Sequence, residues 1–242
     1  MNYNSIDEIL SSGITNMTVL RNNSKQDDGN DTITGVSWFT YNGTVANSIY
    51  ASGNSFIGFG STSEHLKVNR IDGALYSLYR EEGTLYDHYK FLKIRWKGYS
   101  KYSSTSSSYL LEYDVILWDT GDISLHMINI PTSNNTGTYS LTANTTYNYS
   151  VSTSNLDITF KKTDSGFEVV NGIIELELPY NKRYLIRSGS NYYTINNDAL
   201  EQIEISELTS EVFLNMGIVN GIPTITGSLI SNLVNPEILL LE

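Results

Sequence analysis

Short runs of alternating apolar and polar residues fill the middle of the chain, from about Thr32 to Ile195. Successive side chains of a strand point to opposite faces, so a period of two is the pattern of a half-buried strand. The run from Lys90 to Lys97 shows this pattern most clearly. One of its faces carries Leu92, Ile94 and Trp96, and the other carries Lys93, Arg95 and Lys97. We therefore expect a strand with one face in a core and a basic face toward water.

Turn residues separate these runs. Asn42-Gly43 is a strong signal for a tight hairpin turn, because both residue types tolerate positive φ. The four residues 119–122 include a glycine and lie between the β-rich runs 109–118 and 123–130, which predicts a second hairpin. The stretch shows neither a helical period nor strand-helix-strand alternation. The sequence therefore predicts an all-β fold, an antiparallel β-sandwich or a jelly-roll-like domain.

The two ends of the chain differ from this middle. Near the N-terminus, Ile6, Ile9 and Leu10 can share one face of a short helix, with Ser5 as its N-cap. Near the C-terminus, helices are expected over residues 207–216 and 228–234. We therefore expect an N-terminal segment (1–31), a β-sandwich domain (32–195) and an acidic, partly helical C-terminal docking segment (196–242). The apolar residues 238–241 are expected to tuck into the core or to be buried against a partner subunit.

Composition removes several classes of function. The chain of 242 residues carries a formal net charge of −11, whereas a nucleic-acid-binding protein needs a basic surface. Because it has no Cys, it can form no disulfide and no Cys-ligated zinc site. Its opening residues lack the basic start of a secretory signal, and no apolar run is long enough for a membrane-spanning helix. We therefore expect no nucleic-acid partner, no membrane insertion and synthesis in a reducing compartment.

Charge is unevenly distributed along the chain. No Lys or Arg follows Arg187, whereas seven acidic residues do. This acidic end is either a solvated surface or a segment that docks on a basic neighbour, where charge would mainly speed and orient association.

Few residues suggest catalysis. Asp114, Asp119 and Asp122 cluster around the second predicted hairpin, and a pair of carboxylates can hydrolyse a glycosidic bond. Asp119 and Asp122 are also typical turn residues, because an Asp side chain accepts hydrogen bonds from nearby backbone N–H groups. No nucleophile elbow, phosphate loop or dinucleotide motif is present. We therefore expect no enzymatic activity and no cofactor.

The sequence also predicts no metal site. His65, His88 and His126 do not follow a metal-ligand spacing. His126 lies in a predicted strand, where we expect a backbone or hydroxyl partner for its ring. The stretch from Gln26 to Asp31 resembles the start of a calcium-binding loop but lacks the acidic residue at the twelfth position.

Tyrosine is the one residue type in clear excess, with 18 in the chain. Aromatic rings stack on sugars, and the phenol adds a hydrogen-bonding group, so Tyr99, Tyr102 and Tyr109 beside the Ser-rich stretch 103–108 are candidate glycan contacts. Tyr also suits strands and interfaces, because it combines a large apolar body with a polar tip. Both interpretations remain open at this point.

Several longer stretches resemble structural proteins of phage tails and phage-tail-like particles of Gram-positive bacteria. They are SIYASGNSFIGFG (48–60), YREEG (79–83), FLKIRWKGYS (91–100) and LLEYDVILWDTGDISLHMINIP (110–131), followed near the end by FLNMGIVNGIP (213–223) and LISNLVNPEILLL (229–241). The region from 33 to 131 is also loosely similar to a nidogen-type β module. The resemblance rests on pattern and carries no residue with an assigned role.

The resemblance implies a non-enzymatic virion component of the baseplate, fibre or collar region. Such a protein is made in the host cytoplasm and assembles with copies of itself and with neighbouring tail proteins. The alternative is a carbohydrate-binding, receptor-recognition module of the same particle, which would contact a host cell-surface polysaccharide. A glycosidase that uses the three Asp residues is a third hypothesis.

Overall fold

The chain folds into two compact units in the computed structural model. The structure describes residues 1–3, 5–60, 65–68, 72–86, 88–133, 139–149, 156–174, 176, 183–196, 199–203 and 237–241. The larger unit contains residues 12–82 and 90–174, and the smaller contains residues 1–11, 83–89 and 175–242. Each unit joins segments that are distant along the chain.

Strands dominate the larger unit, which confirms the predicted all-β fold. One sheet has the order β9-β10-β11-β12-β15-β16, with β2 also pairing with β9. Its strands are β2 (Thr18–Arg21), β9 (Ala74–Leu85), β10 (Tyr89–Tyr99), β11 (Leu110–Trp118), β12 (Ile123–Asn129), β15 (Asp157–Thr163) and β16 (Gly166–Asn171). A second sheet has the order β14-β13-β8-β7-β6-β3. It contains β3 (Asn30–Thr34), β6 (Ser48–Ser52), β7 (Phe56–Phe59), β8 (His65–Lys67), β13 (Tyr139–Ala143) and β14 (Thr145–Tyr149).

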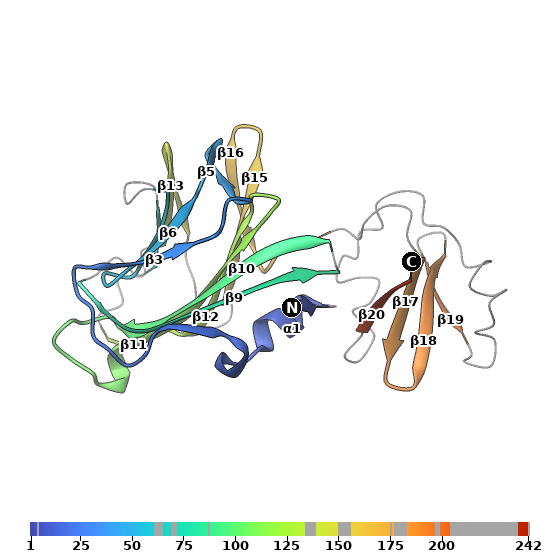
Figure 1. Cartoon of the computed structure of the whole chain (residues 1–242), viewed down its shortest axis with the longest axis horizontal. Helices are drawn as coiled ribbons and strands as arrows, with labels where there is room; N and C mark the ends of the chain where they lie inside the picture. Colours follow the sequence, from blue (N-terminus) through green and yellow to red (C-terminus); the bar gives the residue numbers. More distant parts are fainter. Residues whose placement is uncertain are drawn as a thin grey trace. The chain divides into compact units, whose positions relative to one another are not determined.

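The two sheets pack face to face around one hydrophobic core (Figure 1). Inward side chains of the second sheet, such as Ile49 and Leu66, belong to the same buried cluster as Ile94 and Val115 of the first. Trp96 is fully buried there, and its ring stacks on Tyr113 of β11. This arrangement is a β-sandwich, in which alternate residues of each strand supply the core.

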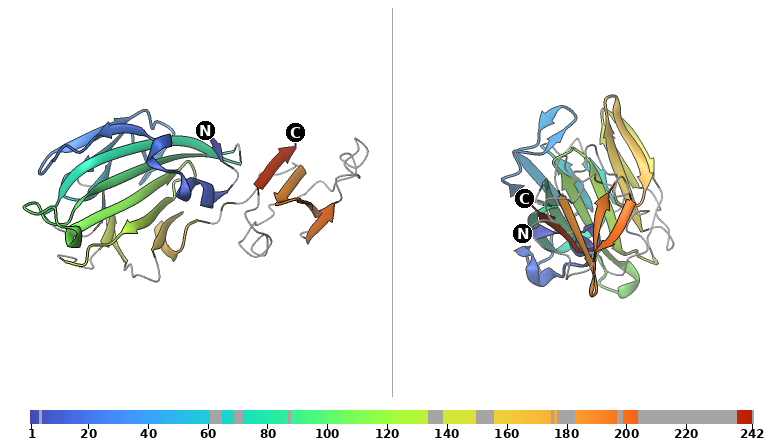
Figure 2. Two further views of the ribbon diagram at one scale, coloured as in Figure 1. Left: turned by 90° about the horizontal axis from the view of Figure 1, so that it is seen from below. Right: turned by 90° about the vertical axis from the view of Figure 1, so that its right-hand side faces the viewer.

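Both hairpins predicted from turn residues are confirmed. Asn42 and Gly43, with φ of 50° and 76°, join the short strands β4 (Thr40–Tyr41) and β5 (Thr44–Val45). Residues 119–122 join β11 to β12, which pair in antiparallel register. The long strands β9, β10 and β11 run side by side from cyan to green in Figure 2.

The expected basic, water-facing side of β10 is wrong in the structure. Lys93 has no exposed surface and Arg95 is only 9% exposed, although Lys97 remains partly open to water. Lys93 pairs with Glu81 of β9, and Arg95 pairs with Asp114 of β11. This face of β10 is therefore buried at Lys93 and Arg95, where opposite charges on neighbouring strands compensate the two basic groups.

The smaller unit contains the N-terminal helix. The predicted helix is α1 (Ile6–Ser11), and its cap is confirmed because Ser5 Oγ accepts a hydrogen bond of 3.1 Å from the Glu8 N–H. Strand β1 (Asn2–Tyr3) pairs in parallel with the last residues of β9. Two short 3₁₀ turns, η1 (Ile14–Asn16) and η2 (Ser107–Tyr109), belong to the larger unit.

A four-stranded antiparallel sheet forms the C-terminal part of the smaller unit. Its order is β19-β18-β17-β20, with β17 (Arg183–Ser188), β18 (Asn191–Asn196), β19 (Ala199–Ile203) and β20 (Glu237–Leu241). The apolar residues 238–241 are thus part of strand β20, which pairs with β17. The helices predicted over 207–216 and 228–234 lie outside the described residues. Within the described part of the chain, no helix is long and apolar enough to cross a membrane.

Candidate functional site

Asp114, the first of the three candidate catalytic carboxylates, is buried on β11. Its two oxygens accept hydrogen bonds of 2.7 Å each from Arg95 Nε and Nη2. The hydrogen bonds from Arg95 to Asp114 raise the pKa of Arg95 above its ordinary value, because the carboxylate favours the charged guanidinium. Such a two-pronged ion pair links β10 to β11.

Asp119 and Asp122 both bind backbone around the hairpin. Asp119 Oδ2 accepts a hydrogen bond of 3.0 Å from the Lys90 N–H, which connects the hairpin to the start of β10. Asp122 Oδ1 accepts one of 2.6 Å from the Lys162 N–H of β15, and Asp122 Oδ2 accepts one from the Thr120 hydroxyl. These contacts are those of carboxylates that fix a turn and its neighbouring strands.

The prediction of a backbone or hydroxyl partner for His126 is wrong. His126 Nδ1 lies 2.6 Å from Asp157 Oδ1 on the neighbouring strand β15. In the strand register, His126 also stands directly opposite Asp114. Arg95, Asp114, His126 and Asp157 therefore form a row across β10, β11, β12 and β15, on the sheet face turned away from the sandwich core.

The structure brings the three candidate glycan-contact residues to one loop but gives each ring a different neighbour. Tyr99 ends β10 and packs edge-on against Tyr76, with ring centroids 5.1 Å apart. Tyr102, 41% exposed, carries the Lys25 ammonium 3.3 Å from its ring centroid. Tyr109 lies 5.3 Å from the Lys101 ammonium. Cation–π contacts thus already use part of the surface that a sugar would need.

A group of carboxylates lies beside this loop, at one end of the sandwich. One oxygen from each of Asp27, Asp28 and Asp72 lies within 4.8 Å of the other two. Asp28 Oδ1 also accepts a hydrogen bond of 3.2 Å from Asn54 Nδ2, and the Asp72 carbonyl accepts one of 3.0 Å from the Tyr102 N–H. Carboxylate and amide oxygens are ligands that hard cations prefer.

Sequence reasoning missed this group because its members come from separate loops. The stretch that contains Asp27 and Asp28 does not complete a continuous calcium-binding loop, and Asp72-Gly73 is typical of a turn. The signal available in the sequence was the acidic run 27–28 beside glycine. The distant partners Asn54 and Asp72 join it only through folding.

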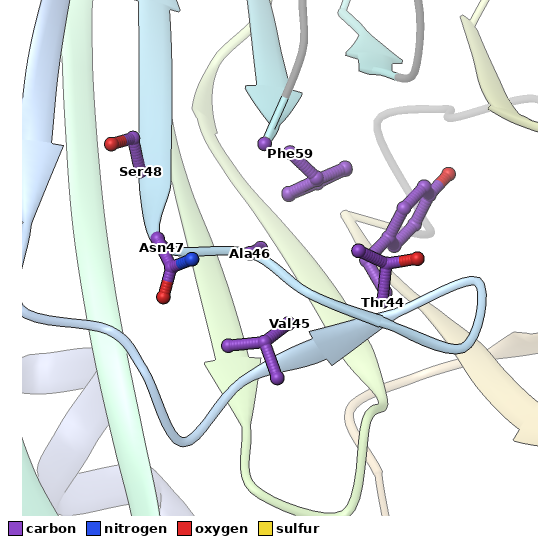
Figure 3. Close-up of a pocket in the computed structure, with 8 residues that line it drawn as sticks. Thr44, Val45, Ala46, Asn47, Ser48 and Phe59 are labelled. Atoms are coloured by element: carbon purple, nitrogen blue, oxygen red, sulfur yellow. The ribbon is translucent and has the colours of Figure 1, made fainter.

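A pocket of about 330 Å³ lies at the β4–β5 hairpin, beside the ends of β6 and β7 (Figure 3). Its lining comprises Tyr41, Val45 and Phe59 as apolar residues and Thr44, Asn47 and Ser48 as polar ones, with Ala46 and Gly60 between them. All of these residues are neutral. The volume is at the lower end of the range for small-molecule sites, so the pocket suits a small uncharged ligand.

Comparison with known proteins gives no relative for this chain. No protein-family model, no curated protein and no solved structure matches it.

Proposed function

We propose that this protein is a non-enzymatic structural component of a phage tail or tail-like particle, in its baseplate, fibre or collar region. The observation that carries the proposal is the resemblance of stretches 48–60, 79–83, 91–100 and 110–131 to such proteins. These stretches fall on β6, β7 and β9–β12, which form the centre of the β-sandwich. The protein would be made in the host cytoplasm and reside in the particle.

Exposed sheet edges support assembly with copies of the chain and with neighbouring tail proteins. Strand β16 ends the order of the larger sheet, and its Val169 and Val170 are 37% and 39% exposed. An edge strand offers unpaired backbone groups to another strand, and exposed β-branched residues add apolar surface. The acidic segment 196–242 is proposed as a second docking surface, for a basic neighbour.

The contacts of the hairpin carboxylates support a function without catalysis. Asp114 neutralises Arg95, while Asp119 and Asp122 hold backbone amides of other strands. A glycosidase needs one carboxylic acid that donates a proton and a second carboxylate that acts on the sugar. Carboxylates used in this way by the fold are poorly suited to those roles.

Assembly is tested by the mass of the protein in solution and by its presence in particles. We expect multi-angle light scattering to find an oligomer for the full chain, and Val169→Lys to reduce its mass, because an edge lysine opposes strand pairing. Ile128→Lys is the matched control, since Ile128 is 39% exposed, close to the 37% of Val169, but lies on the interior strand β12. A monomer at all concentrations, together with absence from purified particles, would contradict the proposal.

The alternative is a carbohydrate-binding module for receptor recognition, favoured by the position of Tyr99, Tyr102 and Tyr109 around one exposed loop. We expect Tyr102→Ala to weaken binding to purified cell-wall polysaccharide by about fivefold, because an exposed aromatic ring contributes on the order of 1 kcal/mol through stacking. Tyr50→Ala, on the other sheet, is the control. Absence of binding by the native chain at millimolar glycan would exclude this alternative.

A further inference from the structure

The pocket at the β4–β5 hairpin has an apolar floor (Figure 3). Tyr41 and Phe59 line it with rings that are almost completely buried, and the centroids of the two rings lie 4.5 Å apart. Val45 adds an apolar side chain that is 44% exposed, so the pocket opens to water beside it. These carbon surfaces favour a ligand that can place C–H groups against them.

Three polar side chains of the same segment also line the pocket. They are the hydroxyls of Thr44 and Ser48 and the amide of Asn47, and none of them makes a hydrogen bond to another residue that the structure describes. A hydroxyl and a carboxamide can each both donate and accept hydrogen bonds. The pocket can therefore offer donors and acceptors together to a bound molecule.

Hydrogen bonds hold the lining in place before a ligand binds. Tyr41 Oη donates a hydrogen bond of 2.6 Å to the Thr142 carbonyl, which ties β4 to β13. The Gly60 N–H donates one of 2.9 Å to the Ser48 carbonyl, which joins the end of β7 to the start of β6. A ligand therefore meets a surface that is largely formed in advance, and this lowers the entropic cost of binding.

The chemistry of the lining selects the class of ligand. No described residue of the lining is charged, so a charged ligand would lose water without gaining a partner of opposite charge. A pure hydrocarbon would cover the amide and the hydroxyls and leave them without hydrogen bonds. A neutral molecule with several hydroxyl groups on an apolar ring matches both surfaces. The volume of about 330 Å³, at the lower end of the range for small-molecule sites, suits one such ring.

We propose that this pocket binds a single uncharged sugar unit. Its C–H face lies against the aromatic floor and Val45, and its hydroxyl groups bind the three polar side chains of the rim. The inference rests on glycan recognition, the alternative function given above, but it assigns the sugar to the hairpin pocket and not to the loop that carries Tyr102.

Isothermal titration of the full chain with single sugars tests the proposal. The neutral probes are glucose, galactose and N-acetylglucosamine, and glucuronate is the charged comparison. We expect saturable binding of at least one neutral sugar with a millimolar dissociation constant, because a small apolar area and a few hydrogen bonds are gained. Glucuronate should bind more weakly, because the described lining offers its carboxylate no positive charge.

Asn47→Ala gives the decisive comparison. We expect the affinity for the bound sugar to fall about fivefold or more, because an exposed amide of the rim and its hydrogen bond to the ligand are lost. Asn148→Ala makes the same change at an exposed position of β14, outside the pocket, and should bind as the native chain does.

Two results would overturn the proposal. The first is that no neutral sugar binds saturably to the native chain at high millimolar concentration. The second is that Asn47→Ala binds sugar as tightly as Asn148→Ala does. In the second case, a loss of binding confined to Tyr102→Ala would show that glycan recognition stands but belongs to the other loop.

Discussion

Replacing Lys93 with Met is expected to lower the free energy of unfolding by about 3–5 kcal/mol, the usual cost of breaking a buried ion pair by removing one partner. Lys93 Nζ lies 2.9 Å from Glu81 Oε2, and both side chains are almost completely buried. Ser12 joins the pair, since its hydroxyl donates 2.8 Å to Glu81 and lies within hydrogen-bond distance of Lys93 Nζ. Removing the ammonium leaves the Glu81 carboxylate buried without its charged partner.

Two further variants separate this effect from general damage to β10. Lys97→Met makes the same change four residues along the strand, where Lys97 pairs with Glu112 at 3.2 Å but is 45% exposed. We expect it to cost less than about 1 kcal/mol, as exposed pairs do. The double variant Lys93→Met, Glu81→Leu should recover much of the loss, because no charge then remains buried. Urea unfolding followed by tryptophan fluorescence measures all three, and equal losses for Lys93→Met and Lys97→Met would contradict the explanation.

Replacing Trp96 with Ala is expected to destabilise the larger unit by about 3–5 kcal/mol, which is typical of a fully buried Trp. Trp96 has no exposed surface, and its ring lies parallel to Tyr113 with centroids 5.4 Å apart. Its Nε1 donates 2.9 Å to the Ser52 carbonyl of β6. The side chain thus joins the two sheets through both packing and a hydrogen bond, and its loss leaves a cavity between them.

Two other tryptophan variants check this interpretation. Trp96→Phe keeps an aromatic ring but loses the hydrogen bond to Ser52, so the loss should be smaller than for Trp96→Ala. Trp38→Ala removes a tryptophan that is only partly buried at the edge of the core and should also cost less. Thermal unfolding by circular dichroism measures the differences. If Trp38→Ala lowers the stability as much as Trp96→Ala does, the contact of Trp96 with both sheets is not what makes its loss costly.

Local signals along the chain were sufficient for the main features of the fold. The period of two in residues 90–97 places Leu92, Ile94 and Trp96 in the core, as the structure has them. Asn42-Gly43 and the loop 119–122 form the predicted hairpins, and Ser5 caps the predicted helix. Each of these features depends on residues that are neighbours in sequence, so composition and spacing determine them.

Features that depend on distant segments required the tertiary structure. Alternation separates Lys93 and Arg95 from the core face of β10, but it cannot tell what covers that face. Lys93 is buried because Ser12, 81 residues earlier in the chain, lies against it. The carboxylates of Asp27, Asp28 and Asp72 meet in the same way, because separate loops bring them together. The sequence by itself determined the alternation and the turns of a β-sandwich, whereas only long-range packing decided which polar residues are buried and which oxygens meet.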